Sequence, residues 1–365
     1  MWDFVVVGAG PAGSRFARKA AESGSDVLML ERSEVGLPLA CSGHLSRDIW
    51  DFVPEESAQR LQQNEIRGAR FHVGGPESRP YAFYRDDPIS NTVDRVELDK
   101  VLAEQAVAAG AELRTQHTVT DVSEQEDHVT VTVVADGEDV LIEGRMVVGC
   151  DGPVSRVRNA LSLPDPDELL HGVLAFDPEP DNDDFVDVHL TVPRFFAWRI
   201  PRGDAGVEYG LATTPDNQVG ELFSAFVEEY GVETENTCSG AIPIGPPNTV
   251  TSHRGFLIGD AAAQTKPFTG GGILYGMTAA DIAAAHIDPH DPNTLQHYER
   301  EWRKALLREI QLGHWLRRAY SFPEPIQRIG LRATAGKIGV HMDRPTSLLS
   351  VEHLRATLSR RRGEH

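Results

Sequence analysis

The residues with the clearest chemical meaning are three glycines near the amino terminus. They lie in Gly8-Ala9-Gly10-Pro11-Ala12-Gly13, after the apolar residues 2–7 and before a helical run over residues 14–23. In a G-x-G-x-x-G turn the first glycine permits the tight turn, the second lets a pyrophosphate approach the backbone, and the third lets helix and strand pack closely. The first N–H groups of the helix then point at the phosphate.

An acid follows this turn at the end of a second apolar run. Glu31 comes directly after Val27–Leu30, and its carboxylate can accept hydrogen bonds from both hydroxyls of a ribose. Strand, turn, helix, strand and acid therefore occur in order within one short unit. The sequence predicts a Rossmann-like βαβ unit that binds a dinucleotide with a free adenosine ribose, which leaves FAD and NAD as candidates.

A second acid, far down the chain, decides between these two. Gly259-Asp260 ends an apolar run, and the triple glycine 270–272 opens a small-residue helix over 273–285. An acid at the end of a parallel strand can hold a ribityl hydroxyl, which FAD has and NAD lacks. The positive end of a helix stabilises a reduced, anionic flavin. Read alone, this is an ordinary strand-turn-helix; after the first motif it predicts FAD.

Two further groups lie between these motifs. Arg95, which opens a helix that also carries Asp99, can clamp a pyrophosphate or lie along the cofactor. The segment reads equally well as a plain helix start with Asp94 as its cap. Asp151-Gly152, with Ser155 and Arg158 on the next helix, is more typical of architecture than of chemistry, and we expect Asp151 to cap that helix.

Composition excludes several classes of function. The formal net charge is −20 over 365 residues, and five of the thirty-five basic residues are lysine. Such a surface repels nucleic acid and anionic membrane from a distance and is typical of proteins soluble in high salt, so we expect a halophile. Three scattered cysteines favour a reducing cytoplasm and argue against a disulfide framework or a metal site. A strand that begins at residue 2 leaves no room for a secretory leader, and we expect a cytoplasmic protein.

The pattern of elements predicts an α/β fold with a discontinuous cofactor domain. We expect its first part at residues 1–165, with an insert at about 68–93, and its second part at 251–291. An antiparallel α+β domain is expected at 166–250 and a helical tail at 292–365. Surface helices are expected within 45–66. Strands are expected in the following segments: 68–73, 81–84, 112–122, 129–134, 140–143 and 146–149.

These residues together resemble a known group of flavoproteins, which includes the aromatic hydroxylases and the geranylgeranyl reductases. Two short segments favour the reductases, including the archaeal digeranylgeranylglycerophospholipid reductases. Leu39-Ala40-Cys41-Ser42-Gly43 looks like their cysteine-glycine loop beside the flavin, and Phe196-Ala197-Trp198-Arg199-Ile200-Pro201 looks like their tryptophan strand beside the prenyl cavity. The similarity runs to about residue 290. It departs from the family at Ser42-Gly43-His44, where further glycine is common, and at Arg202, where lysine is common.

The resemblance implies reduction of isolated C=C bonds in geranylgeranyl chains of membrane lipid precursors or of an isoprenoid quinone tail. Hydride would come from N5 of the reduced flavin. Cys41 either donates a proton or shapes the pocket, and His44 is a weaker proton candidate. Trp198 and Phe196, with Phe195 and Phe268, either line an apolar cavity or pack in a core. We therefore assign Cys41, Trp198 and Phe196 to catalysis.

The predicted cofactor site combines the motifs with residues inside or beside them. It consists of Gly8, Gly10, Ala12, Gly13, Glu31, Arg32, Ala40, Cys41, Gly43, Arg95, Val119, Asp260, Gly271, Gly272 and Ile273.

Two other functions share the cofactor motifs. A flavin monooxygenase, either an aromatic hydroxylase or a polyene epoxidase, would use every one of them, and a non-catalytic prenyl-binding escort protein could keep the fold. The cysteine loop and the tryptophan strand argue against the first, and the intact fingerprint against the second. No second dinucleotide fingerprint is present, so the electron donor is expected to be ferredoxin or a transiently bound NAD(P)H. The tail, with Trp302, Leu306, Leu307, Leu312, Trp315 and Leu316, is expected to cover the second domain or to touch the inner membrane face.

Overall fold

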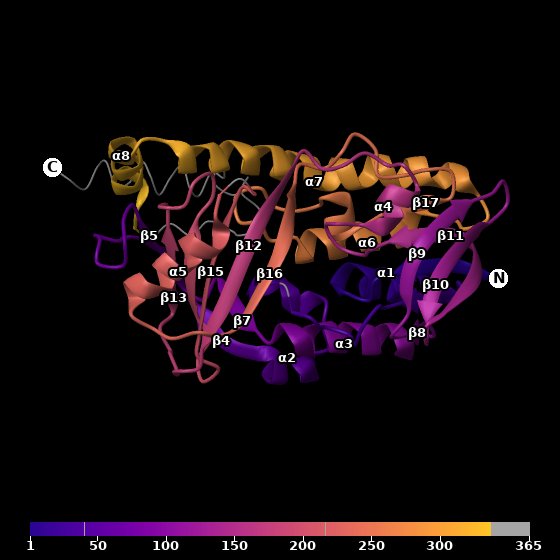
Figure 1. The fold of residues 1–365 in the computed structure, drawn as a ribbon, viewed down its shortest axis with the longest axis horizontal. Coiled ribbons are helices and arrows are strands. Elements are labelled where there is room, and N and C mark those ends of the chain that lie inside the picture. Colours follow the sequence, from indigo (N-terminus) through magenta and orange to yellow (C-terminus); the bar gives the residue numbers. More distant parts are fainter. Residues whose placement is uncertain (40, 216, 337–365) are drawn as a thin grey trace. The chain divides into compact units, whose positions relative to one another are not determined.

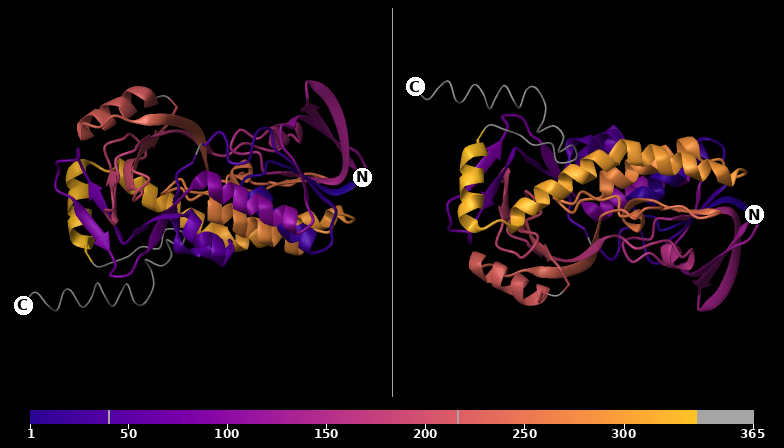
Figure 2. Two further views of the ribbon diagram at one scale, coloured as in Figure 1. Left: turned by 90° about the horizontal axis from the view of Figure 1, so that it is seen from below. Right: turned by 90° about the horizontal axis from the view of Figure 1, so that it is seen from above.

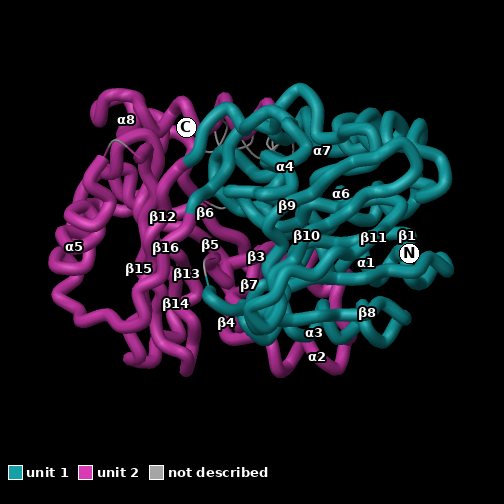
Figure 3. The backbone as a smooth tube through the Cα atoms, turned by 45° about the vertical axis from the view of Figure 1, so that its right-hand side comes forward, with its two compact units in different colours: residues 1–39, 95–169, 241–310 teal, residues 40–94, 170–240, 311–365 magenta. Residues whose placement is uncertain are grey.

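The chain folds into two compact units, each built from several separate segments. The structure is a computed structural model that describes residues 1–39, 41–215 and 217–336 (Figure 1). The first unit comprises residues 1–39, 95–169 and 241–310, and the second comprises 40–94, 170–240 and the chain from 311 (Figure 3). The predicted α/β class is confirmed. The four-part domain division predicted from the sequence stays a proposal. The two compact units group the segments of the chain differently.

A mixed sheet forms the centre of the first unit. Its strand order is β8-β2-β1-β11-β10-β9, and β17 pairs with β11. The strands are β1 (Trp2–Val7), β2 (Val27–Leu30), β8 (Glu112–Arg114), β9 (Thr118–Glu124), β10 (Val129–Ala135), β11 (Glu138–Gly149) and β17 (Gly255–Leu257). β8, β2, β1, β11 and β17 run parallel, whereas β9, β10 and the first half of β11 form an antiparallel meander. The two strands predicted at 140–143 and 146–149 are thus one strand, whose first half pairs with β10 and whose second half pairs with β1.

Helices of the first unit bury apolar side chains against this sheet. They are α1 (Pro11–Glu22), α3 (Arg95–Ala108), α4 (Arg156–Ala160), η2 (Gly259–Ala262), α6 (Ile273–His286) and the first part of α7 (Leu295–Arg318). The short helix η3 (Pro292–Thr294), which precedes α7, has no buried residue. Phe4 on β1, Phe16 on α1 and Phe256 on β17 meet edge to face, with ring centroids 5.1–6.4 Å apart. These aromatic contacts join helix and sheet in one core.

Helix α7 corrects the expectation for the tail. Figure 2 shows it as one unbroken helix. Tyr298, Trp302, Leu306 and Ile310 recur every four residues and are buried in the core of the first unit. Trp302 and Leu306 are therefore neither a membrane surface nor a cover for the second unit. No helix among the described residues is long and apolar enough to span a membrane.

A second seven-stranded sheet, which we call the large sheet, forms the centre of the second unit, in the order β16-β12-β15-β14-β13-β5-β6. The strands are β5 (Gly68–His72), β6 (Tyr81–Tyr84), β12 (Glu168–Asp177), β13 (Phe185–His189), β14 (Ala197–Pro201), β15 (Val207–Thr213) and β16 (Glu235–Ile244). β12, β15, β14 and β13 pair antiparallel, while β13 and β5 are parallel. Phe223 and Phe226 of α5 (Val219–Tyr230) pack with Tyr209 and other side chains of one face. We call this the α5 face and the other the opposite face.

A small sheet corrects the prediction for residues 45–66. Instead of surface helices alone, β3 (His44–Ser46) and β4 (Gln62–Ile66) pair with β7 (Ser90–Val93) on its two sides. Only η1 (Arg47–Asp51) and α2 (Glu55–Leu61) are helical there. The partner strand lies far along the chain, and its polar sequence Ser-Asn-Thr-Val hides the fact that all four residues are buried. The second unit also contains η4 (Ala319–Ser321) and α8 (Glu324–Thr334).

We expect Trp302→Ala to lower the free energy of unfolding by about 3–5 kcal/mol, because the fully buried indole would leave a cavity in the first unit. Trp315→Ala is a matched control on the same helix, with a side chain 67% exposed, and should change stability by less than about 0.5 kcal/mol. Urea denaturation in buffered salt measures both. Equal losses for the two variants would contradict the assignment of α7 to this core.

Candidate active site

The glycine turn lies where β1 meets α1, and backbone contacts fix it. Gly8 has a φ of +100°, and a Cβ there would lie 2.4 Å from the carbonyl oxygen of Cys150. A Cβ on Gly13 would lie 2.0 Å from the carbonyl oxygen of Gly8. No heavy atom lies within 4 Å of the position that a Cβ on Gly10 would take. Gly8 and Gly13 are thus needed by the fold, whereas Gly10 leaves open space at the start of the helix.

Glu31 faces this turn from the end of β2. Its Oε2 accepts a hydrogen bond from the backbone N–H of Ala9 at 2.9 Å, and its Oε1 accepts one from the N–H of Ser33 at 3.3 Å. Arg32, also assigned to the cofactor, is exposed. The register of β1 and β2 pairs Val7 with Leu30, which brings the acid level with the glycines. A ribose beside the turn would therefore meet a carboxylate already oriented by the backbone.

Asp260 lies in the turn after β17, against the start of α6. A Cβ on Gly272 would lie 2.6 Å from its Oδ1. Burial raises the pKa of Asp260 to about 6, and the positive charge of Arg95 opposes that rise. The carboxyl is ionised at neutral pH and protonated in weak acid. Gly271 and Gly272 precede Ile273, the first residue of α6, so their backbone forms the entry to the positive end of that helix.

Arg95 is held as a rigid group. Its two terminal nitrogens donate to the two carboxylate oxygens of Asp99, at 2.7 and 3.2 Å, and the side chain is buried. Because its charge acts on Asp260, the guanidinium belongs to the same side-chain group. Both readings of Arg95 from the sequence placed it at a helix start, and it is the first residue of α3. Its contact with a cofactor stays a prediction.

The Asp151 group is architectural, as the sequence predicted. Its carboxylate accepts hydrogen bonds from the N–H groups of Arg156 and Val157, at 2.7 and 3.2 Å, and from the Ser155 hydroxyl. Ser155 in turn caps α4, and the buried Arg158 donates to the carbonyl oxygen of Ala261 at 3.2 Å. Helix α4 thereby supports the turn that carries Asp260.

The other residues assigned to the cofactor have different surroundings. Ala12 packs against the core of the first unit, and a Cβ on Gly259 would lie 3.0 Å from its methyl carbon. Val119 is 5% exposed within the same core, and its carbonyl oxygen accepts a hydrogen bond from Arg156. Ala40 lies outside the described residues. Phe268, a wall candidate, is buried and belongs to the first unit.

The cysteine loop belongs to the second unit, where β7 holds it. The carbonyl oxygen of Gly43 accepts a hydrogen bond from the N–H of Val93 at 2.9 Å, and a Cβ on Gly43 would lie 2.2 Å from the carbonyl oxygen of Val93. Cys41 is half-buried, and its thiol donates a hydrogen bond to the carbonyl oxygen of Ser42 at 3.6 Å. His44 Nε2 lies 2.8 Å from the hydroxyl of Ser90, which gives this histidine a structural partner.

The tryptophan strand is β14, and Trp198 lies on the opposite face of the large sheet. Its indole covers Gly210 of β15, where a Cβ would lie 2.3 Å from Cζ2. Phe196 stacks on Phe195 with centroids 4.3 Å apart, and Tyr320 meets both rings edge to face. Phe195 is fully buried in this cluster, so core packing accounts for it.

Comparison with known proteins identifies the family. A family model described as "FAD binding domain" matches residues 1–193. Digeranylgeranylglycerophospholipid reductase 2 of Methanothermobacter thermautotrophicus is 30% identical over 371 residues, which cover 92% of each chain. The corresponding reductase of Methanothrix thermoacetophila is 30% identical over 335 residues, which cover 84% of each. The chain belongs to the digeranylgeranylglycerophospholipid reductase family.

Solved structures agree on the fold. A geranylgeranyl bacteriochlorophyll reductase-like protein from Thermoplasma acidophilum superposes with a TM-score of 0.83 at 23% identity, covering 100% of this chain and 97% of that chain. The p-nitrophenol 4-monooxygenase PnpA of Pseudomonas putida has a TM-score of 0.74 at 17% identity, covering 98% and 97%. The fold is therefore shared by reductases and monooxygenases.

The cofactor of this member of the reductase family is FAD, as the sequence predicted. The residues present fit it. Gly10 leaves the space that a phosphate needs, Glu31 offers a carboxylate beside it, and Asp260 offers a second one at the start of α6. FAD supplies hydride chemistry through its isoalloxazine when bound and reduced. The roles of the individual residues remain predictions.

Two residues of this family member escaped the sequence analysis. Lys266 is 5% exposed, and its Cε would lie 3.1 Å from a Cβ on Gly271. Glu208 on β15 is 2% exposed and accepts a hydrogen bond from Trp198. Glu208 interrupts a stretch that is otherwise mostly apolar or small, and a charge in such a stretch is the signal that could have found it. Lys266 follows the polar pair Gln264-Thr265, so the sequence gives no such signal there.

We expect Gly10→Ala to weaken FAD binding by about tenfold or more, because the methyl group would fill the space where the backbone meets the pyrophosphate. Flavin fluorescence during titration of the apoprotein measures this. The apoprotein itself should unfold at an unchanged temperature, since nothing lies within 4 Å and the backbone angles, φ −72° and ψ −175°, suit alanine.

Gly220→Ala in α5 is the matched control, since it too adds a methyl group into open space. It should bind FAD like the unaltered protein. Undiminished affinity in Gly10→Ala would show that the phosphate does not approach this glycine.

Proposed function

We propose that the chain is an FAD-dependent reductase of C=C bonds in the geranylgeranyl chains of membrane lipid precursors. The observation that carries this proposal is the 30% identity to a digeranylgeranylglycerophospholipid reductase over 92% of both chains. The retained FAD motifs support it, since an escort protein would not need them. An isoprenoid quinone tail is the second substrate to be tested, because it presents the same trisubstituted alkenes.

In this proposal the first unit binds and orients the cofactor. The turn from Gly8 to Gly13 holds the pyrophosphate, and Glu31 accepts hydrogen bonds from the adenosine ribose. Asp260 accepts one from the ribityl chain, and it does so best above about pH 6, where it is ionised. The fixed guanidinium of Arg95 keeps Asp260 charged, and the start of α6 offers positive potential.

The second unit supplies the substrate side of the reaction. Trp198 and Phe196 offer aromatic surface to an apolar chain and exclude water from it. Cys41 either donates the proton that the second carbon of the alkene needs or shapes the pocket around it. The electron donor is a ferredoxin or NAD(P)H, and the absence of a second dinucleotide fingerprint in the sequence is compatible with both.

Mass spectrometry of a geranylgeranyl lipid incubated with dithionite-reduced holoprotein tests the function. We expect a gain of two mass units per reduced double bond, from one hydride and one proton. The substitution Cys41→Ala should keep bound flavin but lower turnover by about 10²-fold or more if the thiol donates the proton.

An unchanged lipid mass would overturn the reductase. Oxygen uptake coupled to NAD(P)H oxidation with a phenol or polyene would instead establish the monooxygenase, whose fold is shared. A purified protein that binds no FAD would contradict the reductase and favour the escort role. If Cys41→Ala leaves turnover unchanged, Cys41 does not donate the proton and only shapes the pocket.

Contact with the membrane surface is part of the proposal. The end of α7, the residue after η4 and helix α8 carry four exposed apolar side chains, which we call the tail surface: Trp315, Phe322, Ile326 and Ile329. Arg318 lies over the Trp315 ring at 4.6 Å, and the exposed Arg332 follows on α8. Basic and aromatic groups together suit the anionic headgroups of a bilayer, in contrast to the acidic remainder of the chain.

Flotation with vesicles of anionic lipid tests the tail surface. Replacing its four apolar residues by serine should lower the vesicle-bound fraction severalfold, both at low and at molar salt, because apolar insertion resists screening. Leu141→Ser, at a residue 68% exposed in the first unit, is the control and should float like the unaltered protein. Equal flotation of all three proteins would remove the tail surface from membrane binding.

A further inference from the structure

A buried carboxylate connects the cysteine loop to the tryptophan strand. Glu208 lies on β15, all seven residues of which are buried. Its Oε1 accepts a hydrogen bond from Trp198 Nε1 at 2.8 Å. The hydroxyl of Ser42 and the backbone N–H of Gly43 act on this carboxyl as hydrogen-bond donors that lower its pKa. Three donors from two separate segments of the second unit thus meet on one side chain.

The chemistry of these donors requires an acceptor. An indole N–H and a backbone N–H can only donate, so the side chain between them must accept from both. The Ser42 hydroxyl accepts from the N–H of His44 at 3.2 Å, which leaves its own proton for Glu208. Hydrogen bonds to a carboxylate are about twice as strong as neutral ones. A carboxylate at position 208 can therefore accept from all three donors at once.

Keeping a carboxylate at this position costs stability. Burial raises the pKa of Glu208, while the hydrogen bonds from Trp198 and Ser42 and the charge of Arg202 oppose that rise. Arg202 is itself partly shielded, with its guanidinium 4.5 Å from the centre of the Phe176 ring. An apolar side chain of similar volume would fill a buried strand at lower cost. The presence of a carboxylate here is therefore better explained by its binding of three donors than by a contribution to the stability of the fold.

The loop and the indole are both otherwise close to fixed positions. Gly43 is hydrogen-bonded to Val93 on β7, and its backbone leaves no room for a Cβ. Trp198 lies flat over Gly210, two residues after Glu208 on the same strand and face. Shared hydrogen bonding to Glu208 would fix the position of the loop relative to the indole.

We propose that Glu208 is a positioning residue whose carboxylate clamps the Cys41-Ser42-Gly43 loop and the Trp198 indole into one arrangement. Its importance for turnover rests on the proposed function. The clamp itself does not, since it concerns contacts within the second unit alone.

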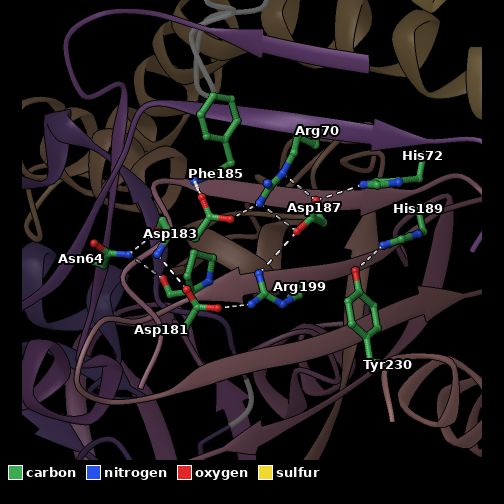
Figure 4. A network of polar contacts seen from close by, with 11 residues as sticks. Asn64, Arg70, His72, Asp181, Asp183, Phe185, Asp187, His189, Arg199 and Tyr230 are labelled. Atoms are coloured by element: carbon green, nitrogen blue, oxygen red, sulfur yellow. Dashed lines mark hydrogen bonds and ion pairs between the residues drawn. The ribbon is translucent and has the colours of Figure 1, made fainter. Parts of the chain in front are cut away.

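The same sheet offers a matched carboxylate on its α5 face. Asp187 of β13 lies 3.0 Å from His72 Nε2 and 2.9 Å from Arg70, and Arg199 approaches it at 3.5 Å (Figure 4). Asp187 and Arg199 are register partners, as are Ile200 and Glu208, so the two acids point to opposite faces. Asp187→Asn therefore weakens a buried polar network of the same sheet without touching the cysteine loop.

The test measures how fast iodoacetamide modifies Cys41 in the FAD-loaded protein, resolved by peptide mass spectrometry. Glu208→Gln keeps the shape of the side chain but turns an –NH2 group toward a donor. We expect alkylation of Cys41 to accelerate about tenfold or more, the factor that corresponds to loss of one charge-assisted hydrogen bond. Cys150, in the first unit, is the internal reference and should not change.

Two further variants complete the comparison. Ser42→Ala removes one donor, leaves the sheet intact and should accelerate Cys41 severalfold, so the test stands even if Glu208→Gln folds poorly. Asp187→Asn should lower the unfolding temperature yet leave the alkylation rate within about twofold of the unaltered protein. In lipid reduction, Glu208→Gln should lower kcat at least tenfold with FAD still bound, while Asp187→Asn should not.

An unchanged Cys41 rate in both Glu208→Gln and Ser42→Ala would overturn the clamp. Equal acceleration by Asp187→Asn would also overturn it, since general loosening of the sheet would then account for the effect. If the unaltered protein reduces no prenyl lipid, the proposed function fails, but the alkylation rates still decide on Glu208.

Discussion

The close backbone packing at the ends of parallel strands is the constraint on which the first unit depends. β2, β1, β11 and β17 end at one edge of the sheet, so Glu31, Gly8, Asp151 and Asp260 gather there from positions far apart in the chain. Gly8 and Gly13 permit this because a single added methyl group would collide with a carbonyl oxygen at either position. The close packing of α1 against the sheet thus brings together the residues that we assign to the cofactor.

The second unit uses one sheet for two polar arrangements. On the α5 face, Asp187 pairs with the half-buried Arg70 and Arg199 and with the buried His72, which is the work of a structural network (Figure 4). On the opposite face, Glu208 serves only donors, and these come from the two segments that resemble reductase motifs. Successive side chains of a strand point to opposite faces of the sheet, and this keeps the two polar arrangements apart.

Local signals made most of the first unit predictable. The glycine turn, Glu31 and the start of α3 depend on neighbours within a few residues, and Gly259-Asp260 depends on a short motif. The sequence analysis failed where partners are distant. β3 and β4 were missed because β7 is polar although buried, and the packing of Trp302 depends on a core assembled from the whole unit. Glu208 was missed because its meaning comes from Ser42, some 166 residues earlier in the chain.

The elevated pKa of Asp260 couples FAD binding to the release of a proton. Below about pH 6 the apoprotein carries a proton on this carboxyl. On the proposed assignment the ribityl hydroxyl needs the bare anion, so uptake of FAD must release that proton. Mild acidity would then favour loss of the flavin, whereas above neutral pH the affinity would no longer depend on this carboxyl.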